Sequence, residues 1–346
     1  MLIQDPMFSE FRLVNQSTGD PALFIDFPGR NDALLFDSGE NDSLPLQVLG
    51  DLEAVFITHH HVDHFIGFDR IVRANLDRDK TLKVFGPDKT IQKIYNRIKS
   101  YEYPFFPFQK VVIDVHDVLA DRIRFARLEC TRRFPRPKIV EHERSGPVIY
   151  QNEAHAIESV LVEHTVPCLA YALVEKPQAR FEHARLAGSG LAEGGWIGQL
   201  MTMLRKGEAE SARIKVHGTD YTLGELKERF CSTTTGARVA YVTDTCWSEA
   251  VRPALIQLAW KAQRLYCDSF YAEEQLKQAV KHKHMTATQA ANFATEASVS
   301  ELVLIHFSTR YQGAYERLVE EARANFPRVS VEIPFEFNKK SPRASN

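Results

Sequence analysis

Short apolar runs alternate with longer amphipathic stretches along this chain. Runs rich in β-favouring apolar residues predict strands at 33–36, 54–57, 111–113, 159–162 and 302–305. Apolar side chains spaced three or four residues apart predict helices at 88–98, 221–229, 249–259, 271–281, 286–298 and 313–325. Thr286 is placed as the N-cap of one of these helices. The alternation predicts an α/β fold in which helices cover sheets of mixed strand direction.

Composition narrows the class of protein. The chain has 346 residues, 43 Lys+Arg against 45 Asp+Glu, and 44% hydrophobic residues, which excludes a disordered, fibrous or membrane protein. Its five cysteines lack CxxC spacing, so we expect neither a disulfide framework nor a thiolate zinc site, and a reducing cytoplasmic setting follows. The first residues lack an export signal, and no run approaches ~18 apolar residues, so we expect no membrane partner. Balanced charge gives no general attraction to nucleic acid, and no DNA partner is expected.

Two segments look inserted between the predicted elements, at 131–148 and 188–207. The second is rich in glycine and lacks Gly-Lys-Ser/Thr, so a mobile loop is favoured over a phosphate cradle. Seven basic residues between Arg122 and Lys138 surround the single acidic Glu129. They fit either a patch for RNA phosphates or, more commonly, a solvated face.

Four histidines and an aspartate directly follow the run 54–57, in the segment Thr58-His59-His60-His61-Val62-Asp63-His64. In an extended turn alternate residues point the same way, so His59 and His61 face one point while Asp63 and His64 face a second. His60 is expected to point outward. A lone histidine is usually a surface ring or satisfied in a core, but this cluster makes little packing sense without an ion. Imidazole and carboxylate favour zinc, with Mn²⁺ or Fe²⁺ as alternatives.

Further polar residues follow other apolar runs. Asp37, Asp244 and His306 come at predicted strand ends, where α/β sheets place their sites. Taken alone, Asp244 could be a turn or helix cap, and His164 and His306 could be structural. Asp37 could orient a ligand histidine or act as a cap.

The segment 56–67 resembles the signature of the metallo-β-lactamase superfamily, and the chain from about 33 to 312 resembles its ribonuclease Z branch, the tRNA 3′-processing endonucleases. The supporting pieces are Asp37-Ser38-Gly39-Glu40, His164-Thr165-Val166-Pro167 with Tyr171, Val242-Thr243-Asp244, His284-Met285-Thr286 and His306-Phe307-Ser308 with Arg310.

The resemblance implies two metal ions, most simply two Zn²⁺. One would be held by His59, His61 and His164, the other by Asp63, His64 and His306, with Asp244 bridging. It also implies a four-layer αβ/βα sandwich of two mixed sheets flanked by helices, a single metallo-hydrolase domain at 1–338 with an arm-like insertion at about 176–215, and a homodimer. The polar residues 339–346 are expected to form a frayed tail.

Two metal ions activate a shared water and stabilise charge on attacking and leaving oxygens, which is chemistry for phosphodiester hydrolysis. We expect Asp63 to orient or deprotonate the water and His284 to protonate the leaving 3′ oxygen. Arg310 would contact a phosphate, with a surface salt bridge as the alternative. These are the catalytic and substrate-binding residues expected from the sequence.

The leading hypothesis is therefore a dinuclear phosphodiesterase that cleaves the 3′ trailer of precursor tRNA. The family's arm carries a Gly-Pro motif, whereas the segment around Gly194-Gly195-Trp196 has no proline. This departure keeps open a hydrolase of a small phosphodiester, a lactone or a thioester. A third possibility is a metal-holding RNA-binding or scaffold subunit, which the full ligand set disfavours.

Overall fold

The computed structural model describes residues 9–27, 32–103, 105, 107–177, 179–233 and 235–332. By contacts, the chain divides into two compact units. The described part of the larger unit runs over 9–149, 157–173 and 238–332, and that of the smaller over 150–156 and 174–237. The predicted frayed tail at 339–346 lies outside the described residues.

One sheet has eight strands that lie in chain order. The first three strands pair antiparallel, the next run parallel from β3 to β6, and the last two pair antiparallel again. The strands are β1 (Glu10–Leu13), β2 (Leu23–Asp26), β3 (Ala33–Phe36), β4 (Leu52–Phe56), β5 (Thr81–Gly86), β6 (Val112–Val118), β7 (Arg122–Glu129) and β8 (Val140–Glu143). Because β8 extends this sheet, the segment 131–148 is partly an edge strand and not only an inserted loop.

A second sheet has seven strands in the order β19-β18-β17-β16-β11-β10-β9. Its strands β16 to β19 are parallel, so their carboxyl ends lie at one edge. The strands are β9 (Val148–Gln151), β10 (His155–Val162), β11 (Cys168–Glu175), β16 (Arg238–Val242), β17 (Arg264–Asp268), β18 (Leu302–Ile305) and β19 (Val329–Ser330).

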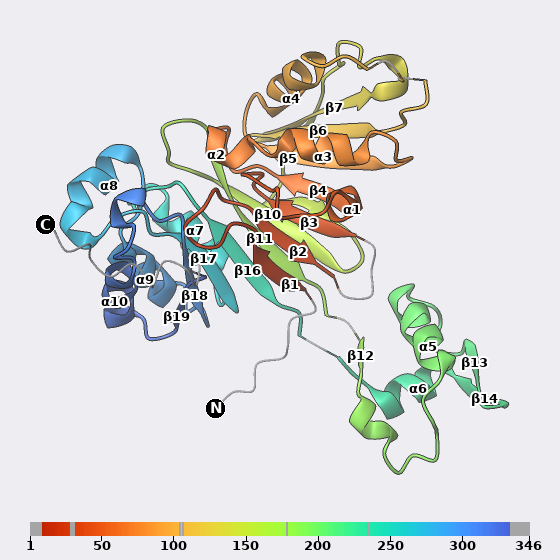
Figure 1. Ribbon diagram of the computed structural model, residues 1–346. Coiled ribbons are helices and arrows are strands. Elements are labelled where there is room, and N and C mark those ends of the chain that lie inside the picture. The colour runs from red at the N-terminus through yellow and green to blue at the C-terminus, as the bar shows by residue number, and fades with distance from the viewer. Residues whose placement is uncertain are drawn as a thin grey trace, which may run out of the picture. The chain divides into compact units, whose positions relative to one another are not determined.

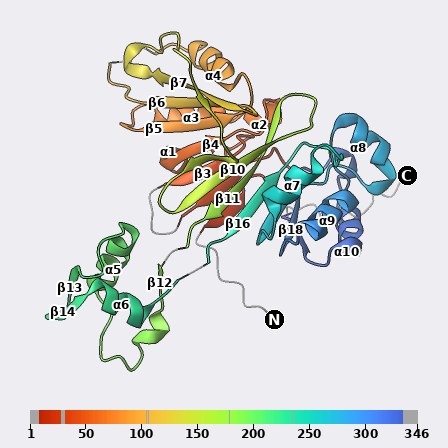
Figure 2. The ribbon, with the colours of Figure 1, turned by 180° about the vertical axis from the view of Figure 1, so that it is seen from behind.

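Helices cover the outer faces of both sheets (Figures 1 and 2). An apolar cluster joins the first sheet to α1 (Leu46–Asp51), α3 (Phe68–Asn75) and α4 (Thr90–Lys99). Another joins the second sheet to α7 (Arg252–Ala259), α9 (Ala287–Glu296) and α10 (Glu316–Asn325). The short helices α2 (Val62–Phe65) and α8 (Leu276–His282) are the remaining α-helices among the described residues of this unit.

Aromatic side chains fill the space between the sheets. Phe36 of β3 packs on Tyr171 of β11 and Tyr241 of β16, with ring centroids 5.6 and 5.7 Å apart, and all three are fully buried. Apolar residues on both faces of the central strands are expected where helices lie outside and a second sheet lies inside. The sandwich predicted from the sequence, two mixed sheets between helix layers, is thereby confirmed.

The smaller unit has a core of its own. It contains β12 (Ala179–Phe181), α5 (Gly195–Arg205), β13 (Arg213–Val216), β14 (Thr219–Thr222), α6 (Leu223–Phe230) and β15 (Cys231–Thr233). Trp196 of α5 lies against Phe181 and Phe230, with ring centroids 5.7 and 5.6 Å apart.

The mobile loop predicted over 188–207 is therefore wrong for its second half, which forms α5. Gly195 and Gly198 disfavour a helix by about 1 kcal/mol each. Burial of Trp196 and Leu200 in the core of the smaller unit offsets that cost.

Among all the described residues, no helix is both long enough and apolar enough to span a bilayer.

Candidate metal centre

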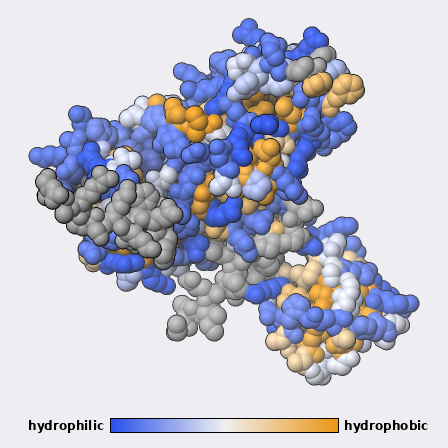
Figure 3. Space-filling model, in the orientation of Figure 1, coloured by the Kyte–Doolittle hydropathy of each residue, from blue (hydrophilic) through white to orange (hydrophobic). Residues whose placement is uncertain are grey.

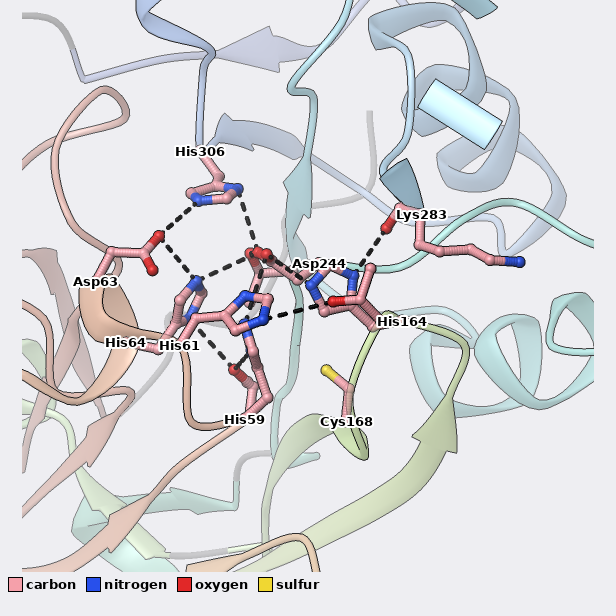
Figure 4. A network of polar contacts seen from close by, with 12 residues as sticks. His59, His61, Asp63, His64, His164, Cys168, Asp244, Lys283 and His306 are labelled. Carbon is pink, nitrogen blue, oxygen red and sulfur yellow. Dashed lines mark hydrogen bonds and ion pairs between the residues drawn. The ribbon is translucent and has the colours of Figure 1, made fainter. Parts of the chain in front are cut away.

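The candidate ligands lie at the carboxyl ends of strands from both sheets of the larger unit (Figure 4). The histidine segment follows β4, with His61 at the N-cap of α2 and both Asp63 and His64 inside that helix. His164 follows β10, Asp244 follows β16, and His306 follows β18. Close packing of glycine lets these loops approach: a Cβ on Gly39 would lie 2.6 Å from the backbone oxygen of Asp63.

Strained backbone marks the same loops. Among the described residues, eleven that are not glycine have positive φ, and four of them lie here: Asp37, Asp244, Lys283 and His306, with φ of 57°, 51°, 60° and 61°. This conformation is unfavourable for L-residues and persists only where the surroundings hold it. Its concentration in these loops is typical of a functional site.

The first group of ligands comprises His59, His61, His164 and Asp244, whose ligand atoms all lie within 4.8 Å of one another. Nε2 of His59 is 3.7 Å and Nε2 of His164 is 3.5 Å from Oδ2 of Asp244. The rings of His61 and His164 are 5.1 Å apart. Three imidazoles and one carboxylate oxygen therefore converge on one point.

The second group uses the other oxygen of the same carboxylate. Oδ1 of Asp244 lies 3.3 Å from Nε2 of His64 and 3.2 Å from Nδ1 of His306. Asp63 completes the group, since its Oδ2 lies 3.4 Å from Nε2 of His64 and 3.3 Å from Nε2 of His306. All seven residues singled out in the sequence are thus brought together, with Asp244 between two points.

Unsatisfied nitrogen atoms test whether a cation fits. Among the described residues, four buried side-chain nitrogen atoms of this cluster lack a hydrogen-bond partner: Nε2 of His59, His64 and His164, and Nδ1 of His306. A buried polar atom without a partner costs about 1–3 kcal/mol. Four such atoms facing one carboxylate fit cation binding, because a metal ion would occupy their lone pairs.

Electrostatics at the site also favour positive charge. Burial opposes the charge of Asp244, yet His306 and His64 hold its pKa well below the usual range. Burial alone would lower the pKa of His64, but Asp244 and Asp37 raise it well above the ordinary value. Burial and the neighbouring His64 lower the pKa of His59 to about 2, so that ring is neutral and its lone pair is free.

Asp37 orients one of the candidate ligands. Its Oδ2 accepts a hydrogen bond from Nδ1 of His64 at 2.8 Å and one from the hydroxyl of Tyr241 at 3.0 Å. Its Oδ1 accepts from the backbone N–H of Thr58 at 2.7 Å. Of the two roles left open by the sequence, the orienting contact to a histidine is therefore present.

His60 turns away from the cluster but does not point to solvent as expected. Its Nε2 is 3.1 Å from Oγ1 of Thr90, and its ring lies 5.4 Å from that of Phe65. The start of α4 covers it, and this burial lowers its pKa to about 3.

His284 lies beside the two groups, and its partner was missed by sequence reasoning. Asp268, fully buried at the end of β17, accepts from Nδ1 of His284 at 2.9 Å. Nε2 of His284 is 4.0 Å from Oδ2 of Asp244, and Phe270 stacks on the ring at 4.3 Å. The signal for Asp268 was available: an apolar run, Leu265 to Cys267, ends in a carboxylate just as the run before Asp244 does.

Arg310 is exposed near the same edge. Its guanidinium lies 5.0 Å over the ring of Tyr271, and its Nη1 donates to Oε1 of Gln275 at 3.4 Å. Tyr271 in turn lies 6.1 Å from the ring of His284. Within the described residues Arg310 forms no ion pair, so the surface salt bridge considered as its alternative is not present.

Four of the seven basic residues in the stretch 122–138 form ion pairs. Arg122 and Arg124 pair with Glu141, Arg127 pairs with Asp114, and Arg132 pairs with Glu129. These pairs favour the solvated face over a phosphate patch.

An apolar rim borders the ligands on one side. Val62 and Ile66, which flank Asp63 and His64 in the chain, are 72% and 47% exposed. Figure 3 shows apolar surface over α2. A substrate that approaches from this side meets apolar side chains next to carboxylate and imidazole.

Comparison with known proteins agrees with this geometry. The model of the metallo-beta-lactamase superfamily matches residues 21–77. A ribonuclease Z from Deinococcus radiodurans is 28% identical over 325 residues, which cover 91% of this chain and 95% of that protein. A ribonuclease Z from Treponema denticola is 27% identical over 323 residues, covering 88% and 90%.

Among solved structures, the metallo-beta-lactamase fold protein YhfI from Bacillus subtilis aligns with a TM-score of 0.54 over 93% of this chain and 94% of that one. Its identity of 14% makes this a likeness of fold. The sandwich, the converging ligands and the near full-length relatives lead to one conclusion. By sequence and by fold, the chain is similar to the ribonuclease Z proteins of the metallo-β-lactamase superfamily, a group of metal-dependent hydrolases.

Proposed function

We propose that this protein is a dinuclear metal-dependent endoribonuclease that removes the 3′ trailer of precursor tRNA. The observation that carries the proposal is the division of Asp244, whose two oxygens face separate groups of ligands. The relatives named ribonuclease Z, matched over nine-tenths of the chain, support an RNA phosphodiester as the substrate.

Two Zn²⁺ are the proposed ions, with Mn²⁺ or Fe²⁺ as alternatives. His59, His61 and His164 would hold one, and Asp63, His64 and His306 the other, with Asp244 shared. Bound there, the ions would lower the pKa of a water molecule and stabilise negative charge on phosphate oxygens. Because the site is built from nitrogen and carboxylate oxygen without thiolate, it suits borderline divalent ions.

The chain's own groups would manage the protons. The side chain of Asp63 is 41% exposed at the rim, where its carboxylate can orient the attacking water and accept its proton. As the bond between phosphorus and the 3′ oxygen breaks, that oxygen must gain a proton, and Nε2 of His284 is placed to donate it. Asp268 holds the ring by its other nitrogen and favours its protonated form.

Arg310 would bind a phosphate next to the scissile one. Its planar guanidinium presents several hydrogen-bond donors. It lies over the ring of Tyr271, and that ring is next to the ring of His284. The smaller unit, which includes most of the predicted arm at 176–215, would contact the body of the tRNA. We further propose a cytoplasmic homodimer, on the resemblance stated above.

A small phosphodiester, a lactone or a thioester is the second candidate substrate. The apolar rim at Val62 and Ile66 favours it, since such a surface suits the organic part of a compact ester. The two candidate substrates differ in size: a tRNA would contact the smaller unit as well as the ligand cluster, whereas a small ester would contact only the ligand cluster and its rim.

A direct test incubates the zinc-loaded protein with a 3′-extended tRNA precursor and with bis(p-nitrophenyl) phosphate, each with and without chelator. Chelator-sensitive cleavage at the end of the acceptor stem supports the proposal. Turnover of the small ester with an intact tRNA precursor would support the second candidate. Zinc-loaded protein inert toward both would refute the proposed activity.

A further inference from the structure

The carboxylate of Glu163 lies where three segments that carry site residues meet. Glu163 directly precedes His164 at the end of β10. Its Oε2 accepts from Oγ of Ser248 at 2.8 Å and from Sγ of Cys246 at 3.4 Å, both in the segment after Asp244. Its Oε1 accepts from Nζ of Lys283, the residue before His284.

Backbone contacts tie the same segments together. The carbonyl oxygen of Glu163 accepts from the N–H of Cys246 at 3.3 Å and from Oγ1 of Thr245 at 3.2 Å. The carbonyl oxygen of Lys283 lies 3.1 Å from Nδ1 of His164 (Figure 4). A carbonyl only accepts, so Nδ1 of His164 carries the proton and Nε2 presents its lone pair to the ligand cluster.

The conformation of Lys283 gives an independent reason to look at its side chain. It is the C-cap of α8, with φ 60° and ψ 48° in the left-handed region. Helices that end this way usually place glycine there, because a Cβ is unfavourable in that conformation. A lysine at this position is less favourable than glycine, and its side chain contacts Glu163.

We propose that Glu163 and Lys283 form a positioning pair for the metal centre. The pair joins the loops that carry His164, Asp244 and His284, and Lys283 orients the ring of His164 through its carbonyl group. The inference rests on the proposed function only in taking these residues as its metal-binding and acid groups. Two residues that are not ligands would thus keep His164 and Asp244 of the first ligand group at the correct positions.

The exposure of the pair separates this role from a simple gain in stability. The side chains of Lys283 and Glu163 are 32% and 37% exposed. Ion pairs that are this accessible contribute little to folding, because water screens them and both side chains lose freedom. Removing the pair should therefore alter the site far more than it alters unfolding.

The sharpest test replaces Lys283 by glycine, which relieves the backbone strain and removes the side chain while keeping the carbonyl group. A matched control is Lys261→Gly, because Lys261 also has positive φ, at 54°, but lies before the start of β17, at the strand end opposite Asp268. We measure urea unfolding of the metal-free proteins, zinc affinity by competition with a chelating dye, and turnover of bis(p-nitrophenyl) phosphate.

Both glycine variants should unfold at the same or higher urea concentration than the unchanged protein. Lys283→Gly should nevertheless bind zinc about 10–100-fold more weakly or lose a similar factor in kcat, whereas Lys261→Gly should match the unchanged protein in both. Glu163→Gln should show the same loss as Lys283→Gly. Lys283→Arg, which keeps the positive charge, should retain most of the zinc affinity and kcat of the unchanged protein.

Unchanged zinc affinity and kcat in Lys283→Gly would overturn the pair, and so would a loss in proportion to lower stability. If the unchanged protein binds zinc but cleaves no ester or tRNA, the proposed activity fails while the affinity comparison still decides on the pair. A chain that binds no zinc overturns both.

Discussion

Asp268 accepts a hydrogen bond from Nδ1 of His284 at 2.9 Å, which leaves Nε2 of that histidine 4.0 Å from the shared carboxylate of Asp244. The ring is thus held by one nitrogen and faces the ligand cluster with the other. This contact fixes the ring orientation of His284, for which we propose the role of proton donor.

Replacing His284 with alanine should leave the zinc content unchanged and lower kcat by about 10²–10⁴-fold, because the leaving oxygen loses its proton donor. Metal analysis and single-turnover cleavage of the tRNA precursor measure the two quantities. Turnover equal to that of the unchanged protein would remove His284 from the mechanism.

Asp268→Asn should move the alkaline limb of the kcat profile to lower pH. Burial opposes charge on His284, but Asp268 and Asp244 raise its pKa above the ordinary value. The protonated donor is therefore fully present at low pH and is lost as the pH rises through that raised pKa. Asparagine keeps a hydrogen-bond acceptor and removes the charge, so the limb should shift down. An unshifted limb would assign it to another group.

Asp244→Asn should weaken both metal positions at once, since each oxygen of this carboxylate faces a different ligand group. Asp63→Asn is the matched comparison, because Asp63 faces only the second group. Zinc stoichiometry by elemental analysis should fall at both positions in the first variant and at one in the second. Equal losses in the two variants would contradict the bridging role.

Removing the metal ions should also destabilise the fold. Ligands that bind only the folded state add about 4 kcal/mol per site when their free concentration is 1,000 times Kd. Unfolding monitored by circular dichroism should shift to lower temperature with chelator and return on adding zinc. A midpoint that does not change with zinc would argue against metal binding by the folded chain.

Arg310→Ala should raise KM for the tRNA precursor by about tenfold, the worth of a charged hydrogen bond to phosphate, with little change for bis(p-nitrophenyl) phosphate. Arg310→Lys should lie between, because it keeps the charge and loses the planar fork. Plotting log KM against log salt should show a slope reduced by about one for the alanine variant. Equal effects on both substrates would place Arg310 outside RNA binding.

Trp196→Ala should unfold the smaller unit without unfolding the larger one, as this side chain lies in a separate core with Phe181 and Phe230. Loss of a buried tryptophan costs about 3–5 kcal/mol, which a unit of this size can hardly tolerate. Cleavage of tRNA should then fall while turnover of the small ester persists. If a variant that has lost this core still cleaves tRNA at the full rate, the smaller unit does not contribute to tRNA binding.

Strong periodic segments of the fold were predictable from the sequence. Strand β18 spans 302–305 as expected, and Thr286 is the N-cap of α9, where its hydroxyl and the side chain of Gln289 form a capping box. Both follow from local chemistry: a short apolar run fits only a buried strand here, and a Thr with Gln three residues later satisfies free N–H groups.

Other features depended on contacts that are distant in the sequence. Asp268 was missed although it ends an apolar run, because its role became visible only where the fold places it beside His284. The helix α5 was missed because its glycines disfavour helix locally, whereas its stability comes from burial of Trp196. The family resemblance already implied the seven ligand candidates with Asp244 bridging, and the coordinates add which oxygen of Asp244 faces each group.

The ligand candidates come from distant parts of the chain, because His59 follows strand β4 of the first sheet and His306 follows strand β18 of the second. During synthesis, the growing polypeptide therefore contains only some of the ligand candidates until β18 has been made and pairs with β17. Chains that end before residue 306 should therefore lack a complete metal centre of the kind proposed and should not cleave RNA.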